Sequence, residues 1–181
     1  MQKKSYDEYY QPAEDTLFFA DNLRNEKGND ALDMGTGSGV LAEILSHNFD
    51  LVVATDINLV ALKKACESVE NCVCCNGGDG LNLDFDLVVC NLPYLPSDEI
   101  NDPAVDGLRD GVEIPMKLIR SAWNVIRQNG KLIYLTSSLA NYLELMKRTE
   151  QLGFSTKILA KKKLFFEELI LVECLKLPSK D

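Results

Sequence analysis

Histidine and tryptophan are nearly absent from this 181-residue chain, which contains one of each. His47 follows a predicted helix, where we expect a surface or helix-end role. Histidine-based catalysis and multi-histidine metal sites therefore have no support. Ser38 lies in a glycine-rich turn without a histidine partner, which argues against a hydrolase. Trp123 falls in an apolar helix stripe and is expected in the core.

Long uncharged hydrophobic runs are also missing. The first twenty residues carry charges throughout, without an apolar core of the signal-peptide type, and no run reaches membrane-spanning length. We therefore expect a cytoplasmic protein with no membrane partner. The length and the hydrophobic fraction of 46% suit one ordinary globular domain, residues 1–181.

Basic residues are scarce, with 19 lysines and arginines against 28 acids and a net charge of -9. Such a field repels polyanions, so nucleic acid is disfavoured as a partner. The basic cluster Lys161-Lys162-Lys163 is interpreted as a solvated turn or edge strand.

Among six irregularly spaced cysteines only Cys72 and Cys75 form a Cys-x-x-Cys pair. No second pair completes a tetrahedral zinc site, so we predict no metal.

What the chain does contain is a regular alternation of short apolar strands and amphipathic helices. Strands are predicted around 30–34, 51–56, 71–76, 85–91, 131–137, 154–160 and 164–175. Helices are predicted at 40–49, 58–69, 114–128 and 139–152. This order predicts an α/β fold of the Rossmann-like type, a mainly parallel seven-stranded sheet with helices on both faces.

In such a sheet, ligands lie over the carboxyl ends of the strands. The first strand ends in Asp33-Met34-Gly35-Thr36-Gly37-Ser38-Gly39, where glycines let the backbone approach a ligand. Val40 stands where a dinucleotide fingerprint has its last glycine. Asp33 would repel a pyrophosphate but suits an ammonium group. Asp56 ends the next strand and can accept from ribose hydroxyls. Asp79 can accept from an adenine amine or, alternatively, cap a helix or turn. An adenosine with an amino-acid tail and no phosphate describes S-adenosylmethionine.

The strand at 85–91 ends in the unusual sequence Asn91-Leu92-Pro93-Tyr94. Pro93 stiffens the loop and removes an N–H, which leaves backbone carbonyls as acceptors. Asn91 adds a side-chain oxygen and Tyr94 a flat ring. Two acceptors and a ring face suit a planar –NH₂ group, and acceptor bonds that strengthen as its nitrogen becomes positive assist methyl transfer. We predict Asn91, Pro93 and Tyr94 as catalytic residues.

Asn-Leu-Pro-Tyr resembles the Asn-Pro-Pro-Tyr signature of amino-methyltransferases that modify adenine, cytosine or glutamine amide nitrogens. The segment "YYQPAEDT" (9–16) is similar to the Tyr-x-Pro-x-Glu-Asp-Thr opening of the HemK-like release-factor glutamine methyltransferases of eukaryotes and archaea. The resemblance covers nearly the whole chain, including "DMGTGSG", "DIN" and "KKKLFFEELILVE". It departs from the common pattern at Leu92, where proline is usual.

This resemblance implies S-adenosylmethionine as cofactor and a set of contacts to it: Thr16, Asp33, Gly35, Gly37, Asp56, Asp79, Gly80 and Asn91. It implies that the substrate amide is held by Asn91, Leu92, Pro93, Tyr94 and Leu95. The implied substrate is the glutamine of the Gly-Gly-Gln loop in a class I translation release factor, methylated on its side-chain amide nitrogen. The implied partner is a small zinc-binding activator in a heterodimer, which we expect at an edge strand near Cys72 to Cys75.

Other functions remain open at this point. They are an adenine amino-methyltransferase acting on DNA or RNA, a protein lysine methyltransferase, and a non-catalytic S-adenosylmethionine-binding scaffold. Only 87 residues follow Tyr94, and completing the sheet uses nearly all of them, which leaves no separate DNA-recognition domain. The acidic stretch from Asp98 to Glu113 either attracts a basic loop or is simply solvated.

Overall fold

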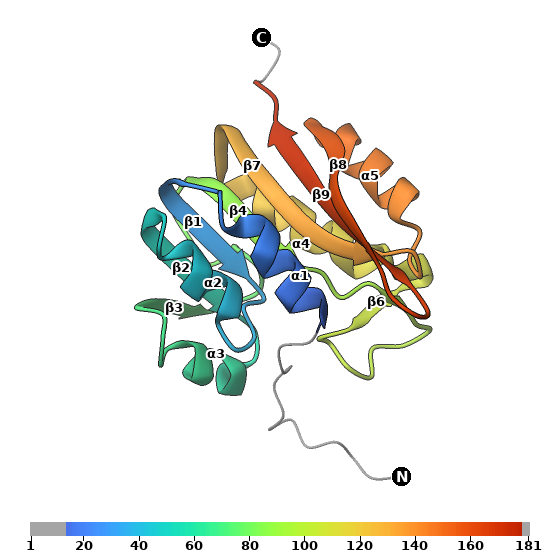
Figure 1. The fold of residues 1–181 in the computed structure, drawn as a ribbon, viewed down its shortest axis with the longest axis horizontal. Coiled ribbons are helices and arrows are strands. Elements are labelled where there is room, and N and C mark those ends of the chain that lie inside the picture. The colour runs from blue at the N-terminus through green and yellow to red at the C-terminus, as the bar shows by residue number, and fades with distance from the viewer. Residues whose placement is uncertain (1–13, 179–181) are drawn as a thin grey trace.

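The computed structural model describes residues 14–178, and its main feature is a seven-stranded sheet of order β3-β2-β1-β4-β7-β9-β8 (Figure 1). Neighbouring strands run parallel from β3 to β7, whereas β9 is antiparallel to both β7 and β8. The strands of this sheet are β1 (Gly28–Met34), β2 (Phe49–Asp56), β3 (Asn71–Cys74), β4 (Phe85–Asn91), β7 (Ile126–Ser137), β8 (Phe154–Lys163) and β9 (Glu168–Lys176). The predicted mainly parallel, seven-stranded sheet is confirmed.

Helices cover both faces of the sheet. They are α1 (Glu14–Leu23), α2 (Val40–Leu45), α3 (Leu59–Ala65), α4 (Glu113–Val125) and α5 (Tyr142–Gln151). The apolar side chains of α1 and α2 enter one core cluster, which includes Phe19 and Leu41. Those of α4 and α5 enter the other, with Ile119 and Leu145 (Figure 1). Residues Ala31–Met34 of β1 are all buried, as expected for a central parallel strand covered on both sides.

The strand order indicates at which end of the sheet a ligand binds. The chain runs outward from β1 to β2 and β3, and then returns to the other side of β1 as β4. The carboxyl ends of β1 and β4 therefore flank the topological switch point, where open α/β sheets bind ligands. A separate two-stranded sheet, β5 (Leu95–Pro96) and β6 (Asp106–Leu108), follows β4 at this end and is continued by the 3₁₀ turn η1 (Arg109–Gly111).

Some predicted boundaries are wrong. The helix predicted at 40–49 ends at Leu45, because Phe49 already pairs with Gly28 as the first residue of β2. The helix predicted at 114–128 ends at Val125, and Asn129-Gly130 lies inside β7. The β4–β7 register shifts here, and Asn129 has a φ of 62°. The Asn-Gly pair thus marks an irregularity in a strand and not a helix stop. Helix α1 and the β5–β6 sheet were not predicted.

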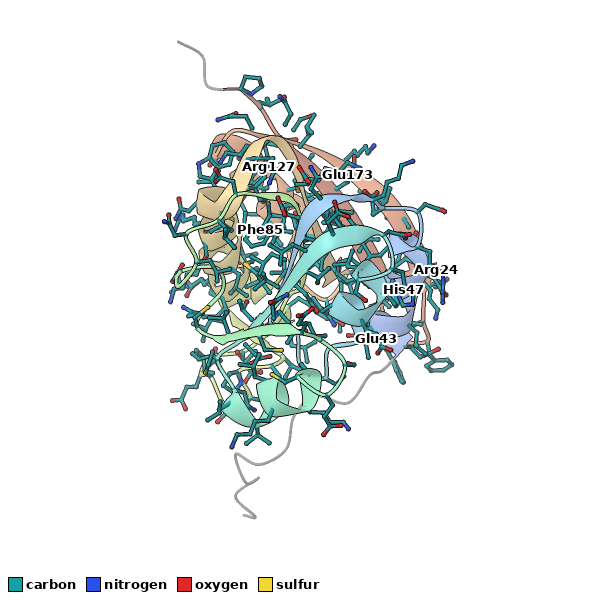
Figure 2. The ribbon with its side chains drawn as sticks, turned by 90° about the vertical axis from the view of Figure 1, so that its left-hand side faces the viewer. Arg24, Glu43, His47, Phe85, Arg127 and Glu173 are labelled. Carbon is teal, nitrogen blue, oxygen red and sulfur yellow. The ribbon has the colours of Figure 1, made fainter. Side chains whose placement is uncertain are left out.

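Further features concern the surface of the described residues. Within residues 14–178, no helix has the length and apolarity needed to cross a bilayer. His47 is exposed just after α2, and its Nδ1 lies 2.9 Å from the carbonyl oxygen of Glu43 (Figure 2). Strand β3 is an edge of the sheet, as predicted, and β8 is the opposite edge. That the whole chain is one domain stays a prediction.

Candidate active site

A cavity of about 1030 Å³ lies over the carboxyl ends of β1, β2 and β4. Its wall consists of the start of α1, the glycine turn after β1, the β2–α3 connection, the segment after β4, residues 101–105 and part of α4. This volume is at the upper end of the range for small-molecule sites, so a cofactor and a substrate side chain fit together. A smaller hollow of about 470 Å³ lies at the other end of the sheet beside Arg127 (Figure 2). There Arg127 is paired with Asp30 and Asp86.

The glycine turn brings backbone to the cavity surface. Gly35, Gly37 and Gly39 have φ values of 68°, 56° and 89°, which side chains rarely adopt. A Cβ built on Gly35 would meet no atom within 4 Å, so the backbone there borders open space. A Cβ on Gly39 would lie 3.0 Å from the Cα of Ala65, so glycine lets α2 and α3 approach each other. The turn is a cradle with room for a ligand.

Asp56 holds this turn in place from the end of β2. Its Oδ2 accepts a hydrogen bond from the N–H of Gly37 at 2.9 Å, and its Oδ1 accepts one from the N–H of Asn58 at 2.8 Å. Each carboxylate oxygen has a further lone pair, and Asp56 lines the cavity. The predicted bonds to two ribose hydroxyls are compatible with this position.

Asp33 is buried beneath the turn and does not line the cavity. Its Oδ2 accepts from the Thr36 hydroxyl at 2.6 Å and from the N–H of Ala42 in α2 at 3.1 Å, whereas its Oδ1 has no partner. Burial raises the pKa of this carboxyl from 3.8 to about 7, although the Thr36 and Ala42 donors oppose the shift. Asp33 thus stabilises the glycine turn and the N-terminus of α2. A contact between Asp33 and a cofactor ammonium group stays a prediction.

Asp79 and Gly80 also lie outside the cavity wall. Asp79 is exposed and accepts a short hydrogen bond from the hydroxyl of Ser121 in α4. Gly80 lies against Cys75, whose Cβ would be 3.1 Å from a Cβ built on the glycine. Their predicted cofactor contacts stay predictions. Within the same segment, Asn76 and Gly77 do line the cavity and were missed by sequence reasoning.

Asn91 is joined to Asp15 of α1 across 76 positions of sequence. Its Nδ2 donates to Asp15 Oδ2 at 3.1 Å, while its Oδ1 is buried and has no partner. Because a carboxylate accepts from the amide nitrogen but not from its oxygen, this bond fixes which end of the amide is left for a ligand. Asp15 is itself buried and accepts from the N–H of Thr16 at 2.6 Å. Its role was missed, although the opening motif contains it immediately before Thr16.

The backbone after Asn91 is packed tightly against the segment at 106–111. A Cβ on Gly107 would lie 2.6 Å from the carbonyl oxygen of Pro93, and one on Gly111 would lie 2.1 Å from that of Tyr94. The N–H of Leu95 donates to the carbonyl of Val105 at 2.8 Å. The carbonyls of Pro93 and Tyr94 therefore face the glycines of a neighbouring segment.

The Tyr94 ring is half-buried on the cavity wall, together with Leu92, Pro93 and Leu95. Burial raises the pKa of the Tyr94 phenol, and the negative charges of Glu167 and Asp15 raise it further. Tyr94 is thus a neutral aromatic wall at neutral pH. Thr16, Gly35, Gly37, Asp56 and Asn91 are the predicted cofactor residues that the structure brings to the same cavity.

The model of a protein family, described as the methyltransferase small domain, matches residues 12–165. The chain belongs to this family. Its sheet and helices are the Rossmann-like fold of the S-adenosylmethionine-dependent methyltransferases, so the predicted fold class and enzyme class are confirmed.

Several relatives are more specific. A protein of Methanocaldococcus jannaschii, provisionally named a protein N5-glutamine methyltransferase, is 33% identical over 194 residues that cover 96% of this chain and 95% of the relative. A release factor glutamine methyltransferase of Bradyrhizobium diazoefficiens is 34% identical over 122 residues, 56% of this chain and 41% of that protein. A solved E. cuniculi Mtq2–Trm112 complex, responsible for methylation of the eRF1 translation termination factor, matches with a TM-score of 0.81 and 30% identity. The match covers 93% of this chain and 98% of that one.

Proposed function

We propose that this methyltransferase transfers the methyl group of S-adenosylmethionine to the side-chain amide nitrogen of the glutamine in a Gly-Gly-Gln loop of a class I translation release factor. The observation that carries the proposal is the buried Asn91 Oδ1, an acceptor without a donor, held in that orientation by Asp15. Glutamine in a release factor as the substrate is supported by the names of the M. jannaschii and B. diazoefficiens relatives and of the E. cuniculi complex. Such a substrate would place the protein in the cytoplasm.

The cavity fits the cofactor. Asp56 would accept from the ribose hydroxyls, and the turn at Gly35 and Gly37 offers close backbone approach without side chains. Thr16 lies on the wall beside Asp15. When bound, S-adenosylmethionine supplies an electrophilic methyl group on a sulfonium sulfur.

The residues of the Asn91–Leu95 segment would orient the amide. The Asn91 Oδ1 accepts one N–H of the substrate –NH₂, and the carbonyl of Leu92 accepts the second, since those of Pro93 and Tyr94 face Gly107 and Gly111. Two such bonds aim the lone pair of the amide nitrogen at the methyl carbon. They strengthen as positive charge develops on the nitrogen, so they stabilise the transition state more than the ground state and lower the barrier. The Tyr94 ring packs against the amide plane and excludes water. The proton becomes acidic only as the methyl group transfers, so no strong base is required.

The two alternative amine substrates fit the described residues less well. A lysine amine is tetrahedral and protonated. It would have to lose a proton before it could accept the methyl group, and two acceptors beside an aromatic wall would instead stabilise its protonated form. An adenine amine has the same planar –NH₂ as glutamine, but the net charge of -9 disfavours a nucleic-acid substrate. Methylation of adenine remains the second candidate because the geometry at Asn91 does not distinguish it.

We also propose that a small zinc-binding activator pairs with β3. This strand is a free edge of the sheet in the described part of the chain. None of its four residues is fully buried, so a partner strand could pair with it. The E. cuniculi relative was solved as a complex with Trm112. If a complex forms but hydrogen-exchange protection appears away from residues 71–76, the placement is wrong.

The decisive experiment is transfer of label from S-adenosylmethionine to a release factor and to its Gly-Gly-Gln→Gly-Gly-Ala variant, with and without the activator. The product is mapped by mass spectrometry. We expect one added methyl group on the glutamine and none in the variant. Label on neither protein would redirect the assignment to adenine in nucleic acid or to a non-catalytic scaffold.

A further inference from the structure

The turn between β8 and β9 carries the two most exposed large apolar side chains of the described residues. Phe165 is 91% exposed and Phe166 is 86% exposed, and their rings meet edge to face with centroids 4.6 Å apart. The turn is closed by a hydrogen bond from the N–H of Leu164 to the carbonyl of Glu167 at 2.8 Å. We call residues 164–167 the aromatic turn. Within residues 14–178, neither ring belongs to a core cluster.

The aromatic turn lies at the same end of the sheet as the candidate active site (Figure 1). Strand β9 begins beside the end of β7, where Leu169 pairs with Ser137, and the N–H of Ser138 donates to Glu168. Leu164 and Tyr94 pack against the same core cluster. The negative charge of Glu167 also acts on the Tyr94 phenol. Glu167 of the aromatic turn is therefore near Tyr94, which lines the cavity.

The charges around the turn select against other occupants. Lys161 is paired with Glu168 at 2.8 Å, and Lys162 lies 3.7 Å from Glu14 of α1. Glu14 and Glu168 thus lie beside two of the lysines of this hairpin, and their negative charge opposes the phosphates of a nucleic acid or lipid, whereas Lys163 is exposed. A partner added to β3 lies at the other edge of the sheet, because six inter-strand spacings of about 4.8 Å separate the two edges by about 29 Å.

We propose that the aromatic turn is a docking site for apolar side chains of the protein substrate, in the segment that flanks the methylated residue. This inference rests on the proposed function, since it requires a protein and not a small molecule or base as substrate. The turn would supply affinity for the folded substrate, while Asn91 and its neighbours act on the amide itself. Exposed aromatic anchors next to a catalytic cavity provide such affinity when the partner covers them.

The test compares wild type with the double variant Phe165→Ser/Phe166→Ser, with the activator bound, in steady-state methyl transfer to an intact release factor. We expect KM for the release factor to rise about 10-fold or more, with kcat changed less than about 2-fold, as loss of docking away from the reacting atoms requires. The dissociation constant of S-adenosylmethionine should stay at the wild-type value. Replacing both phenylalanines by leucine should restore much of the lost affinity, because an apolar contact does not depend on a ring.

Leu83→Ser is the matched control. It removes an exposed apolar side chain, 48% accessible, from the loop before β4 at the opposite end of the sheet, and should leave KM unchanged. A wild-type KM in the double serine variant would overturn the docking inference alone. Loss of the activator from that variant during purification would also overturn it, because the turn would then be the activator's site. If wild type fails to methylate the release factor, the proposed function fails, and the docking inference falls with it.

Discussion

Replacing Asp33 by asparagine should remove a pH dependence of stability that we expect of the wild-type chain. The buried Asp33 carboxyl has its pKa raised from 3.8 to about 7 by desolvation. Between these values the folded chain binds a proton that the unfolded chain has lost, so the contribution of Asp33 to stability is complete below about pH 3.8. It is lost as the pH rises through about 7. Above that pH, the folded chain holds a buried carboxylate with one unpaired oxygen.

The magnitude follows from the two pKa values. Each pKa unit corresponds to about 1.4 kcal/mol, so between pH 5.5 and pH 8 the free energy of unfolding should fall by about 2 kcal/mol through this residue alone. Asparagine keeps the size of the side chain, and its oxygen can still accept from Thr36 and Ala42, but it does not titrate. The difference in unfolding free energy between wild type and Asp33→Asn should therefore change by about 2 kcal/mol over this range.

Urea unfolding at four pH values between 5.5 and 8, without cofactor, measures this difference, and Asp50→Asn controls for the loss of one exposed charge. A constant difference between wild type and Asp33→Asn across this range would refute the argument from desolvation. Repeating the series with S-adenosylmethionine tests the predicted ammonium contact. A cation beside Asp33 would lower its pKa, and the slope between pH 5.5 and 7 would shrink.

Three further substitutions separate chemistry, orientation and cofactor binding. Asn91→Ala should lower kcat about 100-fold while leaving cofactor affinity nearly unchanged, because it removes a transition-state acceptor; an unchanged turnover number would contradict this role. Asp15→Ala should lower kcat about 10-fold or more by freeing the Asn91 amide to turn its nitrogen toward the substrate, at a cost typical of a charged hydrogen bond. Wild-type kcat would show that the bond is dispensable. Asp56→Ala should mainly weaken cofactor binding, and calorimetry that finds wild-type affinity would reject the ribose contact.

The order of strands and helices is predictable from the sequence because each β-strand of the main sheet is either a continuous apolar run or is closed by a turn signal. Boundaries are less predictable where tertiary pairing competes with local pattern. Phe49 continues the helical spacing after Leu45, but pairing with Gly28 draws it into β2. Asn129-Gly130 is a typical helix stop, yet Ile126 already pairs with Phe85, so the Asn-Gly pair becomes a strand irregularity.

The direction of a side chain is harder to predict than the position of its residue. Asp33 and Asp56 lie at the carboxyl ends of β1 and β2, Asp79 follows β3, and all three were predicted to face one cofactor. Only Asp56 does line the cavity. Asp33 turns back to Thr36 and to the N–H of Ala42, and Asp79 turns to Ser121 of α4. Those partners are 3, 9 and 42 positions away, and sequence spacing contains no information on whether a hydroxyl or a free helix N–H lies within reach.

The hydrogen bond between Asp15 and Asn91 gives a physical reason why two separate motifs occur in one chain. The Asn91 side chain lines the cavity, and of its two polar atoms only the oxygen can accept from a substrate amide. The carboxylate of Asp15 bonds the Asn91 nitrogen and leaves the oxygen free. The orientation of the Asn91 amide is thus set by α1, 76 positions away, and not by the Asn-Leu-Pro-Tyr segment itself. The proposed recognition of a substrate amide by Asn91 therefore depends on the acid before Thr16 as well as on the segment that contains Asn91.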